Sequence, residues 1–179
     1  LNEKKGHEYL IQACDLVRQQ GIRFQCDIIG GGSREGALRQ LIQQLGLDGY
    51  VTLHGALPHE AILEAYGRAD IFALACVVAA NGDRDGIPVA LMEAGIAELA
   101  IVSTAVSGIP ELVRHEETGL LVPERNVTAL ADAIVRLSQD PDVRRQLGAN
   151  ARQLVLAEFS SDGLADQLIE AMGDIVGRP

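Results

Sequence analysis

The chain has no tryptophan, and aromatic residues make up only 3% of its 179 positions. Apolar residues still reach 47%, so we expect an aliphatic core. The longest apolar runs are too short to cross a bilayer, and no cationic start followed by an apolar run indicates a signal peptide. These absences favour a cytoplasmic protein, and the length predicts one domain over residues 1–179.

Basic residues are also scarce. The chain has 15 lysines and arginines against 25 aspartates and glutamates, which gives a net charge of −10. Nucleic-acid binding needs a basic face, so we expect no nucleic-acid partner. Anionic small ligands are not excluded, because a local pocket can oppose the sign of the whole chain.

Several patterns of catalytic and cofactor sites are missing. The cysteines Cys14, Cys26 and Cys76 are odd in number and lack metal or redox spacing, which favours small buried hydrophobes. The four histidines lack zinc spacing, and there is no Ser/His/Asp or Cys/His arrangement. G-x-x-x-x-G-K-[ST] is absent, which argues against a P-loop. We therefore expect neither a metal nor a cofactor.

Short apolar runs alternate with one-faced helical patterns along the chain. The predicted strands are Arg23–Ile29, Tyr50–His54, Asp70–Ala75, Ala100–Thr104 and Gly119–Val122. Pro58 and Pro88 suit the first position of a helix, and Asp140 and Ser161 mark two later helix starts. The last helical stripe is Leu164, Leu168, Ala171 and Ile175. This order is typical of the α/β class, with a Rossmann-like parallel sheet flanked by helices on both faces and helices at the C-terminus.

Ligands of such a sheet bind beyond the carboxyl ends of its strands. Four loops follow predicted strands, namely the Gly30 loop, His54–Leu57, Asn81–Ile87 and Ala105–Pro110. We expect these loops to share one edge of the sheet and to form a pocket there.

The most informative stretch is Asn81–Ala94 (NGDRDGIPVALMEA), where a polar loop becomes an apolar helix. Asp85 stands at the junction, and Glu93 stands inside the helix, where a carboxylate is costly without a partner. Free backbone N–H groups at Gly86 and Ile87, together with the helix dipole, favour an anion between the two acids. At helical rise the acids lie about 10 Å apart, comparable to the sugar and the ribose of a nucleotide sugar. We therefore predict a site for a nucleotide diphosphate that bears a sugar.

Two other segments have both an ordinary and a functional interpretation. Gly30, Gly32 and Gly36 form G-x-G-x-x-x-G, one residue longer than a dinucleotide fingerprint. They predict either a tight turn or a turn left bare so that a ligand can approach the backbone. Lys4 and Lys5 precede a helix and form either a solvated loop or a phosphate contact.

Six motifs occur in a fixed order. They are EKKGHEYLIQA, IIGGGSREGALRQL, VTLHGALPHE, the acidic pair Asp85 and Glu93, IVSTAVSGIPELV and TGLLVPE. Together they resemble the C-terminal, donor-binding domain of family 4 glycosyltransferases, the retaining group 1 class with the GT-B fold, and the likeness covers nearly the whole chain. Each motif alone is weak, but six in this order are specific.

The resemblance implies a role for each matched residue. Asp85 would bind the hydroxyls of the transferred sugar and Glu93 the ribose, with the backbone of Gly86 and Ile87 on the diphosphate. Lys5 matches the lysine that neutralises the departing diphosphate. By the same resemblance, an arginine that shares this task would precede Leu1.

The remaining expectations concern the donor and its surroundings. His54 lies in the loop that seats the base, and Gly32 lies in the turn that a ligand would approach. The donor would be a UDP- or GDP-linked sugar. The sequence departs from the family pattern at three positions: Asp85 replaces a glutamate, Glu98 a glycine and Ala100 a proline. Tolerated drift, altered donor preference and reduced activity all stay open as interpretations.

The resemblance also implies a partner domain. The acceptor site would lie on an N-terminal domain absent from this chain, so we expect the fragment alone to be inactive. Association of the full-length enzyme with the inner membrane face stays open. Two alternatives to a glycosyltransferase also stay open: a non-catalytic nucleotide-sugar-binding module and a sugar-nucleotide epimerase of the GT-B type.

Overall fold

The structure is a computed structural model that describes residues 1–159. The helix start expected at Ser161 and the stripe from Leu164 to Ile175 lie outside the described residues.

The strands form two parallel sheets within the described part of the chain. β1 (Cys26–Ile29) pairs with β2 (Val51–Gly55), and β4 (Ala100–Thr104) lies between β3 (Ile71–Leu74) and β5 (Leu120–Val122). The five predicted strands are confirmed, although β1 is shorter than Arg23–Ile29 because its pairing with β2 begins only at Cys26. The single sheet that the sequence predicts is therefore split into two sheets, one with β1 and β2 and one with β3, β4 and β5.

Helices connect the strands and complete the C-terminal half. They are the 3-10 helix η1 (Glu3–Lys5) and the α-helices α1 (His7–Gln19), α2 (Glu35–Gln44), α3 (His59–Arg68), α4 (Val89–Ile96), α5 (Ile109–Leu112), α6 (Val127–Gln139) and α7 (Pro141–Glu158).

Three predicted helix starts can be compared with the structure. Asp140 caps α7 as predicted, because its side chain accepts a hydrogen bond from the Val143 amide at 3.0 Å. Pro58 and Pro88, expected at first helical positions, instead stand one residue before α3 and α4. Their rings fix φ near −60°, but ψ is 155° and 131°, which is extended rather than helical.

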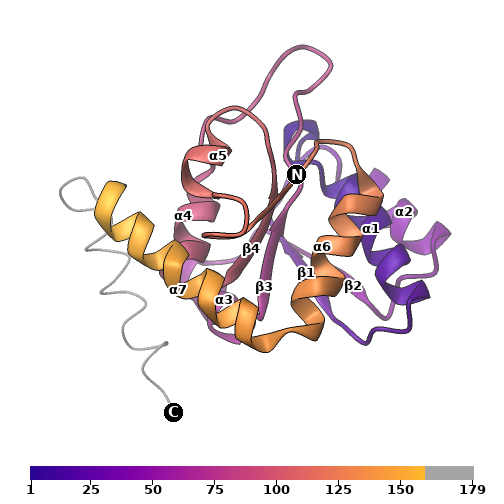
Figure 1. Ribbon diagram of the computed structural model, residues 1–179. Coiled ribbons are helices and arrows are strands. Elements are labelled where there is room, and N and C mark those ends of the chain that lie inside the picture. Colours follow the sequence, from indigo (N-terminus) through magenta and orange to yellow (C-terminus); the bar gives the residue numbers. More distant parts are fainter. Residues whose placement is uncertain (160–179) are drawn as a thin grey trace.

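Helices cover both faces of the β3–β4–β5 sheet. On one side α3, α4, α5 and α7 enclose an apolar core, and on the other side α1 and α6 enclose a second one (Figure 1). Every residue of β4 is buried, as expected for a strand between two helical layers. The aliphatic core predicted from the composition is confirmed, since leucine, isoleucine, valine and alanine dominate both clusters.

The β1–β2 pair has a core of its own with α1 and α2. Exposure alternates along β2, where Val51 and Leu53 are buried while Thr52 and His54 are exposed. The thiols of Cys14 on α1 and Cys26 on β1 meet here. Their hydrogen bond, together with burial, raises the pKa of Cys14 above its usual range.

The loops at the carboxyl ends of the strands come together in two groups. The Gly30 amide donates to the Gly55 carbonyl at 2.7 Å, which joins the loops after β1 and β2. Gly108, in the loop after β4, packs so closely against Gly86 and Ile87 that a Cβ there would lie 3.0 Å from the Ile87 side chain. These contacts join the four predicted loops in two pairs, and a pocket that all four loops share stays a prediction.

Candidate functional site

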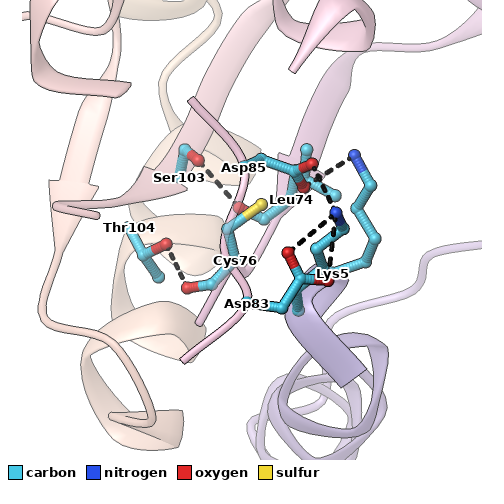
Figure 2. A network of polar contacts seen from close by, with 8 residues as sticks. Lys5, Leu74, Cys76, Asp83, Asp85, Ser103 and Thr104 are labelled. Atoms are coloured by element: carbon cyan, nitrogen blue, oxygen red, sulfur yellow. Dashed lines mark hydrogen bonds and ion pairs between the residues drawn. The ribbon is translucent and has the colours of Figure 1, made fainter. Parts of the chain in front are cut away.

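Four charged side chains meet where the loop after β3 approaches η1. Lys5 Nζ lies 2.9 Å from Asp85 Oδ2, and Lys4 Nζ lies 3.4 Å from Asp85 Oδ1 (Figure 2). Lys4 also reaches Asp83 at 3.3 Å. The hydrogen bond to Asp83, with the charge of Asp85 added, raises the pKa of Lys4 above its usual value, so this ammonium stays charged. Two predicted catalytic residues, Lys5 and Asp85, are therefore in direct contact.

The carboxylate of Asp85 has ion-pair partners but does not use all of its hydrogen-bonding capacity. Its side chain is 18% exposed, and Oδ2 is buried without a hydrogen-bond partner among residues 1–159, although the Lys5 ammonium is close. A buried carboxylate oxygen gains most from a donor with good geometry. The cluster thus balances charge but leaves hydrogen-bonding capacity on Asp85 unused.

Strand ends below this cluster are fixed by two buried hydroxyl groups. Ser103 donates to the Leu74 carbonyl at 2.8 Å, and Thr104 donates to the Cys76 carbonyl at 2.5 Å (Figure 2). Both bonds run from β4 to the end of β3, where the loop that carries Asp85 begins. They hold the start of that loop to the rigid sheet.

Further contacts hold the same loop from the side. Glu124 accepts the Val78 amide at 2.9 Å, and Arg125 donates to the Val78 carbonyl, so consecutive residues engage both polar groups of Val78. Glu3 accepts the Ala80 amide at 3.0 Å. Sequence reasoning missed these anchors, because they lie 46 to 77 residues from the groups they hold.

α4 starts at Val89, four residues after Asp85. Within the described chain no side chain caps this helix, and Pro88 occupies the N-cap position. Gly86 is exposed and has open space where a Cβ would stand. An uncapped helix N-terminus presents amide groups and the positive end of the dipole. This geometry suits an anion beside Gly86 and Ile87.

Glu93 lies further along the same helix. It is half-buried, and the Tyr66 hydroxyl donates to its Oε2 at 2.9 Å. The partner required for a carboxylate among apolar residues is therefore Tyr66. The sequence pattern places this tyrosine only in an apolar stripe, formed by Ile62, Ala65, Tyr66 and Ala69, that predicts the helix after Pro58. The one available signal was a hydroxyl-bearing side chain in that stripe.

Gly32 and His54 have local partners at the other pair of loops. A Cβ on Gly32 would overlap the backbone of Leu1, whose nitrogen donates to the Gly31 carbonyl, so the close approach expected of a bare turn is made by the chain itself. His54 Nε2 lies 2.7 Å from Asp27 Oδ1 on the neighbouring strand. Roles for Gly32 and His54 in ligand binding stay predictions.

Comparison with known proteins identifies the family and the fold of this chain. Residues 1–154 match the family model described as glycosyl transferases group 1. The chain is 44% identical over 173 residues to the amylovoran biosynthesis glycosyltransferase AmsK of Erwinia amylovora, covering 96% of this chain and 42% of AmsK. The chain therefore spans less than half the length of this relative.

Two solved structures share the fold. The C-terminal domain of a glycosyl transferase group 1 family protein (LpcC) from Francisella tularensis superposes with a TM-score of 0.77 at 21% identity, over 90% of this chain and 83% of that one. HepE of Anabaena in complex with UDP-glucose superposes with a TM-score of 0.79 at 22% identity, over 97% of this chain and 46% of HepE. Both confirm the GT-B-type α/β fold expected from the sequence.

Proposed function

This chain belongs to the group 1 glycosyl transferases, and from that premise we propose that it binds the nucleotide-diphosphate sugar used by a retaining glycosyltransferase. The acceptor would be held by an N-terminal domain outside this chain. We propose a UDP- or GDP-linked donor and an exopolysaccharide or glycoconjugate product. The UDP-glucose complex of HepE and the name of AmsK support these two proposals.

One observation carries the proposal. Asp85 contacts Lys5, which is 80 positions away in the sequence, and stands four residues before the uncapped start of α4, the helix that carries Glu93. Asp85, the start of α4 and Glu93 thus follow one another along the chain, with the Lys5 cation beside Asp85. Their order suits sugar, diphosphate and ribose in turn.

The proposed chemistry is mainly electrostatic. The acceptor hydroxyl oxygen forms a bond to the anomeric carbon on the face from which the diphosphate leaves, the bond from that carbon to the phosphate oxygen breaks, and the hydroxyl proton passes to the leaving diphosphate. Lys5 and the amides at Gly86 and Ile87 would stabilise the negative charge that develops on the leaving diphosphate, usually the largest catalytic term. No step needs a metal ion, which stays a prediction.

Donor binding requires an exchange of partners. In the structure Lys5 neutralises Asp85, and Lys4 neutralises Asp83 and Asp85. Lys5 would turn from Asp85 to the diphosphate, and Asp85 would then accept hydrogen bonds from sugar hydroxyls. Because the two lysines are already matched by two aspartates, the cluster has little excess positive charge. We therefore propose that the isolated chain binds the donor weakly and scarcely transfers sugar.

Ligand-observed NMR with UDP-glucose and GDP-mannose tests the proposal. We expect contacts to both nucleotide and hexose protons for at least one donor, and weaker binding in Lys5→Ala. Arg145→Ala, which removes a charge from an exposed part of α7, is the matched control and should bind as the wild type does. Absence of binding to both donors would refute the proposal.

Two further outcomes separate the alternatives. Contacts to the nucleotide without contacts to the hexose would favour a non-catalytic binding module. A changed sugar nucleotide after incubation of the full-length protein without acceptor would favour an epimerase. The non-catalytic binding module is tested because Asp85 is shorter than the usual glutamate and its carboxylate is paired with two lysines.

Location is a separate proposal. Among residues 1–159 no helix is both long and apolar enough to cross a membrane. We propose a cytoplasmic location with the full-length enzyme at the inner membrane face. Fractionation of cells that express it, before and after a high-salt wash, tests this.

A further inference from the structure

Tyr66 is a buried tyrosine with a charged partner. It lies on α3, is only 8% exposed, and its ring meets Phe72 of β3 at 5.8 Å between centroids with a 48° tilt. α3 and α4 belong to the same core cluster and lie on the same side of the sheet (Figure 1). Packing thus fixes the ring, and the ring fixes the direction of its hydroxyl.

The hydroxyl has two acceptors within reach. Glu93 Oε2 lies at 2.9 Å and the Ala90 carbonyl at 3.5 Å. One proton can serve only one of them well, and the shorter, charge-assisted bond to the carboxylate is stronger. Burial, followed by the charge of Glu93, raises the pKa of Tyr66 above its usual range, so the hydroxyl keeps its proton. Glu93 therefore has a permanent donor on Oε2.

A carboxylate has more acceptor positions than this one bond uses. Two oxygens offer about four lone-pair sites, and Tyr66 occupies one of them. A glutamate on a helix otherwise has several rotamers, and holding one of them costs side-chain entropy when a ligand binds. A fixed Oε2 leaves Oε1 in one position before any ligand arrives.

We propose that Tyr66 is a positioning residue that holds Glu93 in the orientation in which its carboxylate accepts hydrogen bonds from the ribose hydroxyls of the donor. The inference rests on the proposed function, since it assigns the ribose to Glu93. Tyr66 itself need not touch the nucleotide. Its effect is confined to ligands that carry ribose hydroxyls.

Titration of the 179-residue chain tests this. The probes are UDP and GDP, each compared with its 2′,3′-dideoxy form, in wild type and Tyr66→Phe. We expect Tyr66→Phe to weaken binding of the ribonucleotide about five- to tenfold, as for loss of a charge-assisted hydrogen bond that acts through one residue. Binding of the dideoxy form should change less than twofold.

Tyr50→Phe is the matched control. Tyr50 forms the same kind of ring pair, with Phe24 at 5.4 Å, but stands at the N-terminal end of β2, opposite the predicted site. It should leave both affinities unchanged. In a Glu93→Gln background, Tyr66→Phe should no longer alter the preference for ribose over dideoxyribose, because the residue acts only through Glu93.

The outcomes separate this inference from the proposed function. If wild type binds a ribonucleoside diphosphate and Tyr66→Phe keeps the same preference for ribose, the inference is overturned and the proposed function stands. Equal weakening of both nucleotide forms would show a structural role and also overturn it. If wild type binds neither UDP nor GDP, the proposed function and the inference fall together.

Discussion

Glu98 adopts a backbone conformation that glycine would adopt more easily. It follows α4 with φ of 57°, in the left-handed region. The Leu99 amide donates to the Ala94 carbonyl and the Glu98 amide to the Gly95 carbonyl, both at 3.0 Å. This pattern is a Schellman motif with Glu98 at the position that is usually glycine. The glycine that the family resemblance led us to expect therefore has a physical reason.

The turn cannot relax readily. Gly148 of α7 packs so tightly that a Cβ there would overlap the Glu98 carbonyl. A non-glycine residue in this conformation costs about 1–2 kcal/mol. The compensating ion pair joins Glu98 and Arg152 at 3.0 Å, but their side chains are 46% and 31% exposed, so we expect less than about 1 kcal/mol from it.

Comparison of Glu98→Gly with Glu98→Ala isolates the backbone term, because both lose the ion pair. Glycine also loses more conformational entropy on folding, about 0.5–1 kcal/mol, which reduces the difference. We expect Glu98→Gly to be more stable than Glu98→Ala by about 0.5–1 kcal/mol, a Tm about 2–3 °C higher. Calorimetry or chemical unfolding measures this.

Equal stability of the two variants would refute the reasoning. Arg152→Ala measures the ion pair separately, and its effect should fade in high salt. Glu98→Gly should also keep wild-type nucleotide affinity, because the change lies at the end of α4 opposite Gly86 and Ile87. A changed donor preference would show instead that this turn contributes to specificity.

Three further predictions concern other local features. Asp140→Ala should destabilise the fold by about 1 kcal/mol by removing the cap of α7, whereas Asp142→Ala, exposed in the first turn, should change it by less than about 0.5 kcal/mol; urea unfolding measures both. Burial lowers the pKa of His7 to about 4, so its contribution to stability is present above pH 6.5 and is lost as pH falls from 6.5 towards 4. Wild type should therefore lose more stability than His7→Leu over that range in unfolding curves recorded at several pH values. Gly6→Ala should cost about 3 kcal/mol, since φ is 62° and the added Cβ would overlap the Ala75 carbonyl; thermal unfolding measures this loss.

Features that depend on neighbours in the sequence were predicted well. The cap at Asp140 and the apolar β4 are local patterns, and both appear as expected. Pro58 and Pro88 were misplaced by one residue because a proline ring sets φ but leaves ψ free, and ψ decides whether the residue belongs to the helix. The sequence therefore predicts the presence of these helices more reliably than their first residues.

Features that depend on distant contacts were predicted in part. The resemblance pointed to Lys5 and Asp85 separately, but not to their ion pair, which only the fold creates. Tyr66 was hidden because a tyrosine in an apolar stripe is usually core, and here it is core and a donor at once. His54 met Asp27, a partner that becomes adjacent only through the register of β1 and β2.

The ion pair between Lys5 and Asp85 affects which donor groups the shorter acid can contact. An aspartate carries its carboxylate one methylene closer to the backbone than a glutamate does. Here it stays beside Lys4 and Lys5, and one of its oxygens lacks a hydrogen-bond partner in the described part of the chain. On the proposed function, a diphosphate would draw Lys5 away, while Lys4 would still neutralise Asp85 during the exchange. The substitution should therefore weaken contact with the sugar more than contact with the nucleotide, because Glu93 and the start of α4 do not depend on the length of that acid.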